Sequence, residues 1–164
     1  MVLRAARGAG LPQGHAEDVA RAAVDALIRD PACAGGIGTA LHAPALSIPC
    51  PDGDTLHFTA TPVVWAGPVI RDALDAGAAR VVAAQVDWPA LLAAMLPDAS
   101  MIWEGADAIV QPVADPAPRP VPRGPVHVDP TAWAALAALA ARTLVPETDL
   151  SRIAGAGAGV LDVD

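Results

Sequence analysis

The stretch TLHFTATPVVWAGPVIRDALDAGAARVVAAQVDWPALLAAML, residues 55–96, decides the fold class. Apolar and polar side chains alternate over residues 55–61, which predicts a strand with one apolar face. Residues 68–76 predict a short helix, because Pro stands near its start and Gly follows its end. Residues 80–86 are apolar and β-branched and predict a second strand. Asp87-Trp88-Pro89 predicts an N-cap followed by Pro in the first turn of a further helix, which ends at residue 96. This alternation indicates helices packed on a sheet.

The N-terminal third adds helices and one more strand. Residues 15–29 predict an amphipathic helix that follows an earlier short helix. Its polar face alternates in charge at four-residue spacing, which predicts a solvated face; these residues are Glu17, Arg21, Asp25 and Arg29. Residues 34–43 contain three glycines and predict a turn. Residues 46–49 predict a strand that a Pro51-Asp52-Gly53 turn joins to the strand at 55–61.

The C-terminal half predicts the remaining strands, a long loop and a last helix. Residues 100–113 predict one strand, or two strands joined at Glu104-Gly105. Proline is too frequent over residues 112–125 for regular structure, so we expect a wrapping loop, with a polyproline ligand as the alternative. Asp129-Pro130 predicts the cap of a last helix, residues 131–144. Its expected buried stripe is Trp133, Leu136, Ala140 and Leu144. Residues 1–164 therefore predict a single α+β (or mixed α/β) domain with one small mixed sheet.

Charge and composition exclude several classes of function. The formal net charge is −8, which argues against binding to nucleic acid or to anionic lipid. All ten basic residues are arginine, so a Schiff-base lysine and a phosphate-loop lysine are excluded. The two cysteines form no disulfide framework, and no signal peptide is evident, so we expect a cytoplasmic protein. The longest apolar run, residues 132–141, is too short to span a membrane.

The candidate site is the Arg- and Gly-rich C-terminal segment. Glycines at alternate positions let successive backbone N–H groups converge on an anion, and nearby arginines add bidentate contacts. The expected ligand-binding residues are Arg7, Arg142, Ser151, Arg152, Gly155, Gly157 and Gly159. The alternative is a flexible tail or a tightly packed extended segment. No helix follows these glycines, so they make no dinucleotide motif, and no cofactor can be identified.

Acidic residues at the C-terminus offer a metal site as a second hypothesis. Asp162 and Asp164 would point the same way in an extended segment, beside the terminal carboxylate, and could bind Mg²⁺ or Ca²⁺. A solvated acidic tail is the alternative. Two weaker sets are a scattered zinc site and paired carboxylates at Glu104 and Asp107. The alternative for Glu104 and Asp107 is a hairpin turn with polar residues. The zinc set would be Cys33, His42, Cys50 and His57. No catalytic residue can be assigned.

Both ends of the chain resemble one family. The N-terminal motif is AARGAGLPQG at residues 5–14. The C-terminal motif has four parts, which are RTLVP at 142–146, SR at 151–152, GAGAG at 155–159 and DVD at 162–164. They resemble an uncharacterised bacterial domain-of-unknown-function family. The chain departs from the family pattern at Gln13, Leu144 and Val163. The resemblance implies no activity.

Three hypotheses follow from the sequence. The first is a cytoplasmic protein that binds a small anionic molecule through its C-terminal segment. The second is a metal-assisted enzyme in which Asp162 and Asp164 act with Glu147 or Asp149. The third is a structural protein, for which sparse aromatic residues and a high apolar content favour a homodimer.

Overall fold

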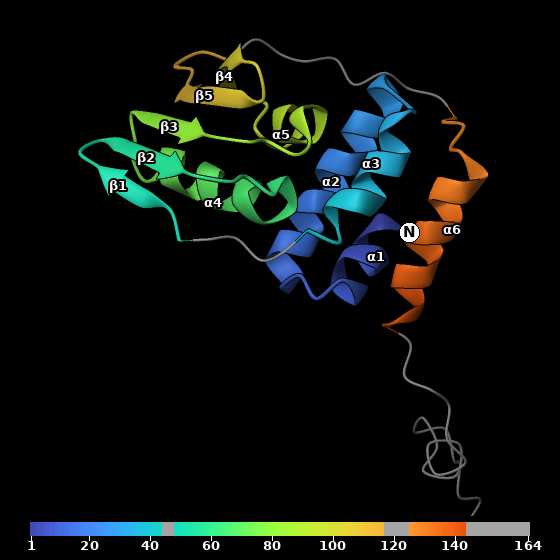
Figure 1. The fold of residues 1–164 in the computed structure, drawn as a ribbon. Helices are drawn as coiled ribbons and strands as arrows, with labels where there is room; N and C mark the ends of the chain where they lie inside the picture. Colours follow the sequence, from blue (N-terminus) through green and yellow to red (C-terminus); the bar gives the residue numbers. More distant parts are fainter. Residues whose placement is uncertain (44–47, 117–124, 144–164) are drawn as a thin grey trace, which may run out of the picture.

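Helices and strands alternate along the part of the chain that the structure describes. This computed structural model describes residues 1–43, 48–116 and 125–143. In chain order the elements are α1 (Val2–Gly8), α2 (Gln13–Arg29), α3 (Cys33–Ala40), β1 (Cys50–Asp52), β2 (Thr55–Phe58), α4 (Val63–Asp75), β3 (Arg80–Ala83), α5 (Pro89–Met95), β4 (Ala99–Glu104), β5 (Asp107–Pro112) and α6 (Pro130–Ala141). The fold is α+β, with the helices packed beside one mixed sheet (Figure 1).

The sheet has five strands in the order β1-β2-β3-β5-β4. Strands β2 and β3 are parallel and are joined through α4, since a parallel pair needs a crossover connection. The other neighbours are antiparallel, and β4 and β5 form a hairpin in which Glu104 pairs with Asp107. The alternative of two strands joined at Glu104-Gly105 is therefore confirmed. Gly105 lies in the turn with φ +66°, a value that glycine adopts without strain.

Side-chain alternation gives the sheet a buried face and an open face. Phe58, Val81 and Val110 are buried on the side toward the helices. The next residues along the strands form a register row of His57, Val82, Ile109 and Ile102 on the other side. Ile102 is 55% exposed. The open face is consistent with the antiparallel pairing of most strands, which tolerates solvent on one side.

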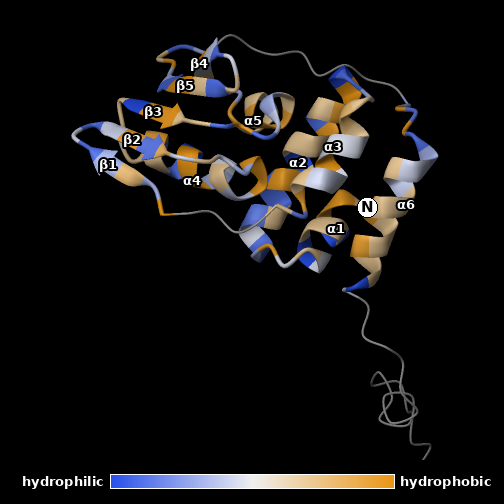
Figure 2. Ribbon diagram, viewed as in Figure 1, coloured by the Kyte–Doolittle hydropathy of each residue, from blue (hydrophilic) through white to orange (hydrophobic). Residues whose placement is uncertain are grey.

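The helices form layers behind the buried face of the sheet. α4 and α5 lie next to the sheet, and α2 packs against both of them (Figure 1). α3 and α6 contact each other, and α1 packs against α2 and α6. α6 is the layer farthest from the sheet, and apolar colours run along most of it in Figure 2. α2 therefore lies between the helices next to the sheet, α4 and α5, and the helix α1 on its other side.

Three predicted elements have the wrong identity or limits. Residues 34–40 lie in helix α3 rather than in a turn, because burial of Cys33 and Ile37 outweighs the low helix propensity of glycine. Strand β1 is Cys50–Asp52 rather than 46–49, and its turn lies at Gly53-Asp54. Residues 44–47 lie outside the described ranges. β3 ends at Ala83 rather than at residue 86.

Two predicted helix limits also differ. α4 begins at Val63, so Pro68 lies inside it, although proline in a helix interior removes a hydrogen bond. The run Val63, Val64 and Ala66 is fully buried, which compensates for the lost bond. In α6, Asp129 caps the helix as predicted, but Trp133 is 47% exposed rather than buried. Leu136 and Ala140 are buried as predicted, and Leu144 lies outside the described residues.

Asp87 was expected to cap α5, but it caps α4 instead. The residue before α5 is Trp88, which makes no side-chain cap. The Asp87 carboxylate accepts a hydrogen bond of 2.9 Å from the backbone N–H of Val63, the first residue of α4. Loss of hydration raises the pKa of Asp87 above its ordinary value, while hydrogen bonds from Val63 and two other N–H groups act the other way. One carboxylate thus ties the start of α4 to the segment after β3.

This cap gives a test by mutation and pH. Asp87→Ala should lower the free energy of unfolding by about 1–2 kcal/mol, because an N-terminal donor of α4 loses its partner. Asp87→Asn keeps an acceptor oxygen and should be close to neutral. The pKa of Asp87 is higher in the folded protein than in the unfolded chain. The Asp87 carboxyl therefore adds to the free energy of unfolding at low pH, and this contribution is lost as pH rises through the folded-state pKa. Urea unfolding from about pH 3 to pH 7 should therefore show Asp87→Asn gaining on the wild type as pH rises.

The control for this prediction is Asp52→Asn, which removes one exposed carboxylate from β1. A wild-type advantage over Asp87→Asn that grows with pH would contradict the argument.

Candidate functional site

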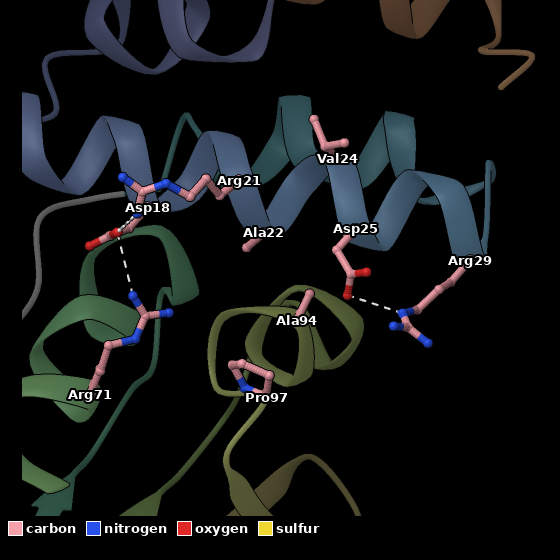
Figure 3. A pocket seen from close by; sticks show the side chains of 9 residues that line it. All are labelled: Asp18, Arg21, Ala22, Val24, Asp25, Arg29, Arg71, Ala94 and Pro97. Carbon is pink, nitrogen blue, oxygen red and sulfur yellow. Dashed lines mark hydrogen bonds and ion pairs between the residues drawn. The ribbon is translucent and has the colours of Figure 1, made fainter. Parts of the chain in front are cut away.

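A hollow with several arginines lies between α2, α4 and α5. Its volume is about 380 Å³. We call it the arginine cleft, and it is lined by Asp18, Arg21, Ala22, Val24, Asp25, Arg29, Arg71, Ala94 and Pro97 (Figure 3). α2 supplies one wall, Arg71 comes from α4, and Ala94 and Pro97 come from α5 and the residues after it.

Helical spacing puts the charged residues of α2 on one side. Asp18, Arg21, Asp25 and Arg29 follow one another at intervals of three or four residues, which share a helix face. The sequence predicted that this face is solvated, but α4 and α5 pack against α2 beside it. The side chains of Asp18 and Asp25 are only 24% and 26% exposed. Arg21 pairs with Asp18 rather than with Glu17, and Glu17 instead accepts a hydrogen bond from Gln13.

At one end of the cleft, two guanidinium groups share one carboxylate. Oδ1 of Asp18 lies 2.9 Å from a terminal nitrogen of Arg21 and 3.4 Å from a terminal nitrogen of Arg71. Arg71 also donates a hydrogen bond to the carbonyl oxygen of Met95, the last residue of α5. Arg71 therefore holds three helices together. Arg21 is different, because 73% of its side chain is exposed to solvent.

At the other end, Arg29 and Asp25 form a pair. Nε of Arg29 donates to Oδ2 of Asp25 at 3.0 Å. The hydrogen bond and the negative charge of Asp25 raise the pKa of Arg29 above its ordinary value, so the guanidinium stays charged. The second oxygen of Asp25 is buried and has no hydrogen-bond partner among the described residues. Arg29 and Asp25 therefore form an ion pair at this end of the cleft.

The charges in the cleft do not balance. Three arginines and two aspartates line it, which leaves one excess positive charge (three minus two). The whole chain has a formal net charge of −8, so the excess is local. Between the two charged ends lie the small apolar side chains of Ala22, Ala94 and Pro97 (Figure 3). This arrangement can hold an anion, because guanidinium groups bind carboxylate and phosphate oxygens in pairs.

The structure describes only two of the residues that the sequence assigned to an anion site. Arg7 is exposed at the end of α1, and Arg142 is exposed at the end of α6. These two helix ends meet, because a Cβ placed on Gly8 would lie 1.8 Å from the Leu139 carbonyl oxygen and 3.4 Å from Cβ of Arg142. The N-terminal motif thus contacts the start of the C-terminal one. The other residues of this prediction lie outside the described ranges: Ser151, Arg152, Gly155, Gly157, Gly159, and the metal candidates Asp162 and Asp164.

The proposed zinc ligands do not come together. Within residues 1–43, 48–116 and 125–143, no group of three or more His, Cys, Asp or Glu side chains could hold a metal ion. Cys33 is buried in α3, and burial raises the pKa of its thiol. His42 contacts the carbonyl oxygen of Gly38 through Nδ1, whereas Cys50 and His57 face each other across β1 and β2. The zinc hypothesis is therefore wrong for this set.

The paired carboxylates at Glu104 and Asp107 have a structural explanation. They are register partners at the end of the β4–β5 hairpin. Oδ1 of Asp107 accepts a hydrogen bond of 2.9 Å from the N–H of Gln85, which has a φ of +51°. Asp107 thus supports an unusual backbone conformation in the segment after β3. This contact favours the polar hairpin over a catalytic pair.

Sequence reasoning missed the arginine cleft. The pair of Asp18 and Arg21 could have been found from its three-residue spacing on a predicted helix. The contributions of Arg71, Ala94 and Pro97 could not, because they depend on how α4 and α5 pack against α2. No local pattern in residues 68–97 predicts that α4 and α5 pack against α2.

Comparison with known proteins leaves the family open. No protein-family model, no curated protein and no solved structure matches the chain. The resemblance of the two end motifs to a bacterial domain-of-unknown-function family therefore stays a prediction. In the described ranges, none of the helices combines the length and the apolar character that crossing a membrane requires.

Proposed function

We propose that this protein binds a small anionic molecule and that the arginine cleft holds the negative group. The observation that carries the proposal is the Asp18 carboxylate, which two guanidinium groups, those of Arg21 and Arg71, share at one end of the cleft. An exposed ion pair contributes only about 0–1 kcal/mol to stability. Arg21 can therefore exchange its share of Asp18 for a ligand oxygen at little cost.

The other hypotheses remain proposals with different support. The C-terminal segment is a second place for the same function, and the contact of Gly8 with α6 supports it, because that contact joins the helix ends that carry Arg7 and Arg142. A cytoplasmic location is supported by two free thiols, Cys33 and Cys50. A homodimer is supported by α6, which has no charged residue from Pro130 to Ala141 and an exposed Trp133. The metal-assisted enzyme depends on carboxylates outside the described residues.

Calorimetric titration of the full chain with inorganic phosphate and with acetate tests the proposal. Arg21→Gln should weaken binding about 10–150-fold, because a hydrogen bond to a charged group contributes about 1.5–3 kcal/mol. Arg80→Gln is the matched control, since Arg80 is an exposed arginine at the start of β3 outside the cleft. Binding that is lost in Arg152→Ala and kept in Arg21→Gln would move the site to the C-terminal segment. Absence of binding to either anion would contradict the proposal.

A further inference from the structure

The arginine cleft has features that specify its ligand beyond a negative charge. Among the described residues, its lining contains no aromatic side chain. Proteins hold nucleobases by stacking on aromatic rings, so a nucleotide would find no such contact here. The charged groups lie at the two ends, and a sugar placed between them would put its hydroxyl groups against Ala22, Ala94 and Pro97, which offer no side-chain hydrogen bond. The ligand therefore has a simpler body than these.

The floor of the cleft is apolar. Ala22 is 4% exposed, and Ala94 packs against the hydrophobic core. Figure 3 shows Ala22, Ala94 and Pro97 between the Asp18 end and the Asp25 end. An apolar chain laid along this floor would remove both its own surface and that of the cleft from water.

The two ends of the cleft are not equivalent. The Asp18 end has two guanidinium groups for one carboxylate, whereas Arg29 and Asp25 neutralise each other at the other end. A ligand with one negative group therefore suits the cleft better than a ligand with a negative group at each end. Asp18 and Asp25 are seven residues apart on α2, so the floor is about 10 Å long at 1.5 Å per residue.

We infer that the ligand is an unbranched carboxylic acid of medium chain length, with its carboxylate at Arg21 and Arg71 and its chain along Ala22, Ala94 and Pro97. This inference rests on the proposed function, because it assigns the body of the molecule whose anionic group the cleft holds. The carboxylate replaces part of the Arg21–Asp18 ion pair, and the chain covers the floor toward Asp25.

The experiment is a calorimetric titration of the full chain with straight-chain carboxylates from acetate to decanoate, below their micelle concentrations. Each added methylene should tighten binding about fourfold, which corresponds to the transfer of one buried methylene from water. The gain should level off once the chain spans the floor of about 10 Å. Arg21→Gln should weaken every member of the series by a similar factor.

Ala94→Asp tests the position of the chain. A carboxylate on the floor should abolish most of the gain with chain length, because an apolar chain cannot cover a charged group without a large cost. Ile48→Asp is the matched control, because Ile48 is 94% exposed and lies outside the cleft. Acetate binding without a gain along the series in the wild type would overturn the inference and leave the proposed function standing. A gain with chain length that survives Ala94→Asp would also overturn it, whereas the absence of all binding would remove both.

Discussion

Replacing Gly8 by alanine is expected to lower the free energy of unfolding by about 3 kcal/mol. Gly8 is the last residue of α1, where α1 packs against α6. An added Cβ would lie 1.8 Å from the carbonyl oxygen of Leu139 and 2.8 Å from its carbonyl carbon. Both atoms belong to the backbone of α6, so no side-chain rotation relieves the overlap. The two helices must move apart, and their packed interface is lost.

The matched control is Gly14→Ala in α2. Apart from the local backbone of α2, no atom of the described residues lies within 4 Å of a Cβ at Gly14, so only the backbone effect of the substitution remains. Alanine in a helix is favoured over glycine by about 0.5–1 kcal/mol, and Gly14→Ala should therefore be neutral or stabilising. Urea unfolding of both variants measures the difference. If Gly8→Ala unfolds at the same urea concentration as Gly14→Ala, the close approach of α1 and α6 is not as described.

Local signals predicted the elements that depend on local interactions. The cap of α6 follows from the preference of aspartate for this position, and Asp129 accepts hydrogen bonds from the N–H groups of Thr131 and Ala132. The β4–β5 hairpin follows from a glycine between two apolar runs. The apolar face of α2 follows from its helical spacing, since Ala16, Val19 and Ala23 are fully buried.

Elements that depend on distant packing could not be predicted in this way. The start of α4 depends on Asp87, which is 24 residues away in the chain. The arginine cleft requires Arg71 to reach both Asp18 and the end of α5. Helix α3 has low local helix propensity, with glycine at positions 35, 36 and 38, and it forms because its buried face packs against neighbouring helices. This packing leaves no room for a side chain at Gly36.

Gly36→Ala is expected to lower the free energy of unfolding by about 3 kcal/mol, which is as large an effect as that of Gly8→Ala. A Cβ on Gly36 would lie 1.6 Å from two ring carbons of Trp88, Cη2 and Cζ3. An indole ring is rigid, and Trp88 stands at the N-cap of α5, where its backbone is fixed by the helix that follows. The absence of a side chain at Gly36 therefore lets the ring of Trp88 pack directly on α3. This packing forms the contact between α3 and α5.

A neighbouring glycine and a double substitution test this explanation. Gly35→Ala changes the same helix one residue earlier, where no atom lies within 4 Å of a Cβ, and should stabilise the protein by about 0.5–1 kcal/mol. Trp88→Leu removes the ring, so the double variant with Gly36→Ala should be more stable than the sum of the two single losses predicts, by at least about 1 kcal/mol. Chemical unfolding of the wild type, Gly36→Ala, Trp88→Leu and the double variant gives this coupling energy. Additive losses would mean that the glycine is required by the backbone of α3 and not by the tryptophan that packs on it.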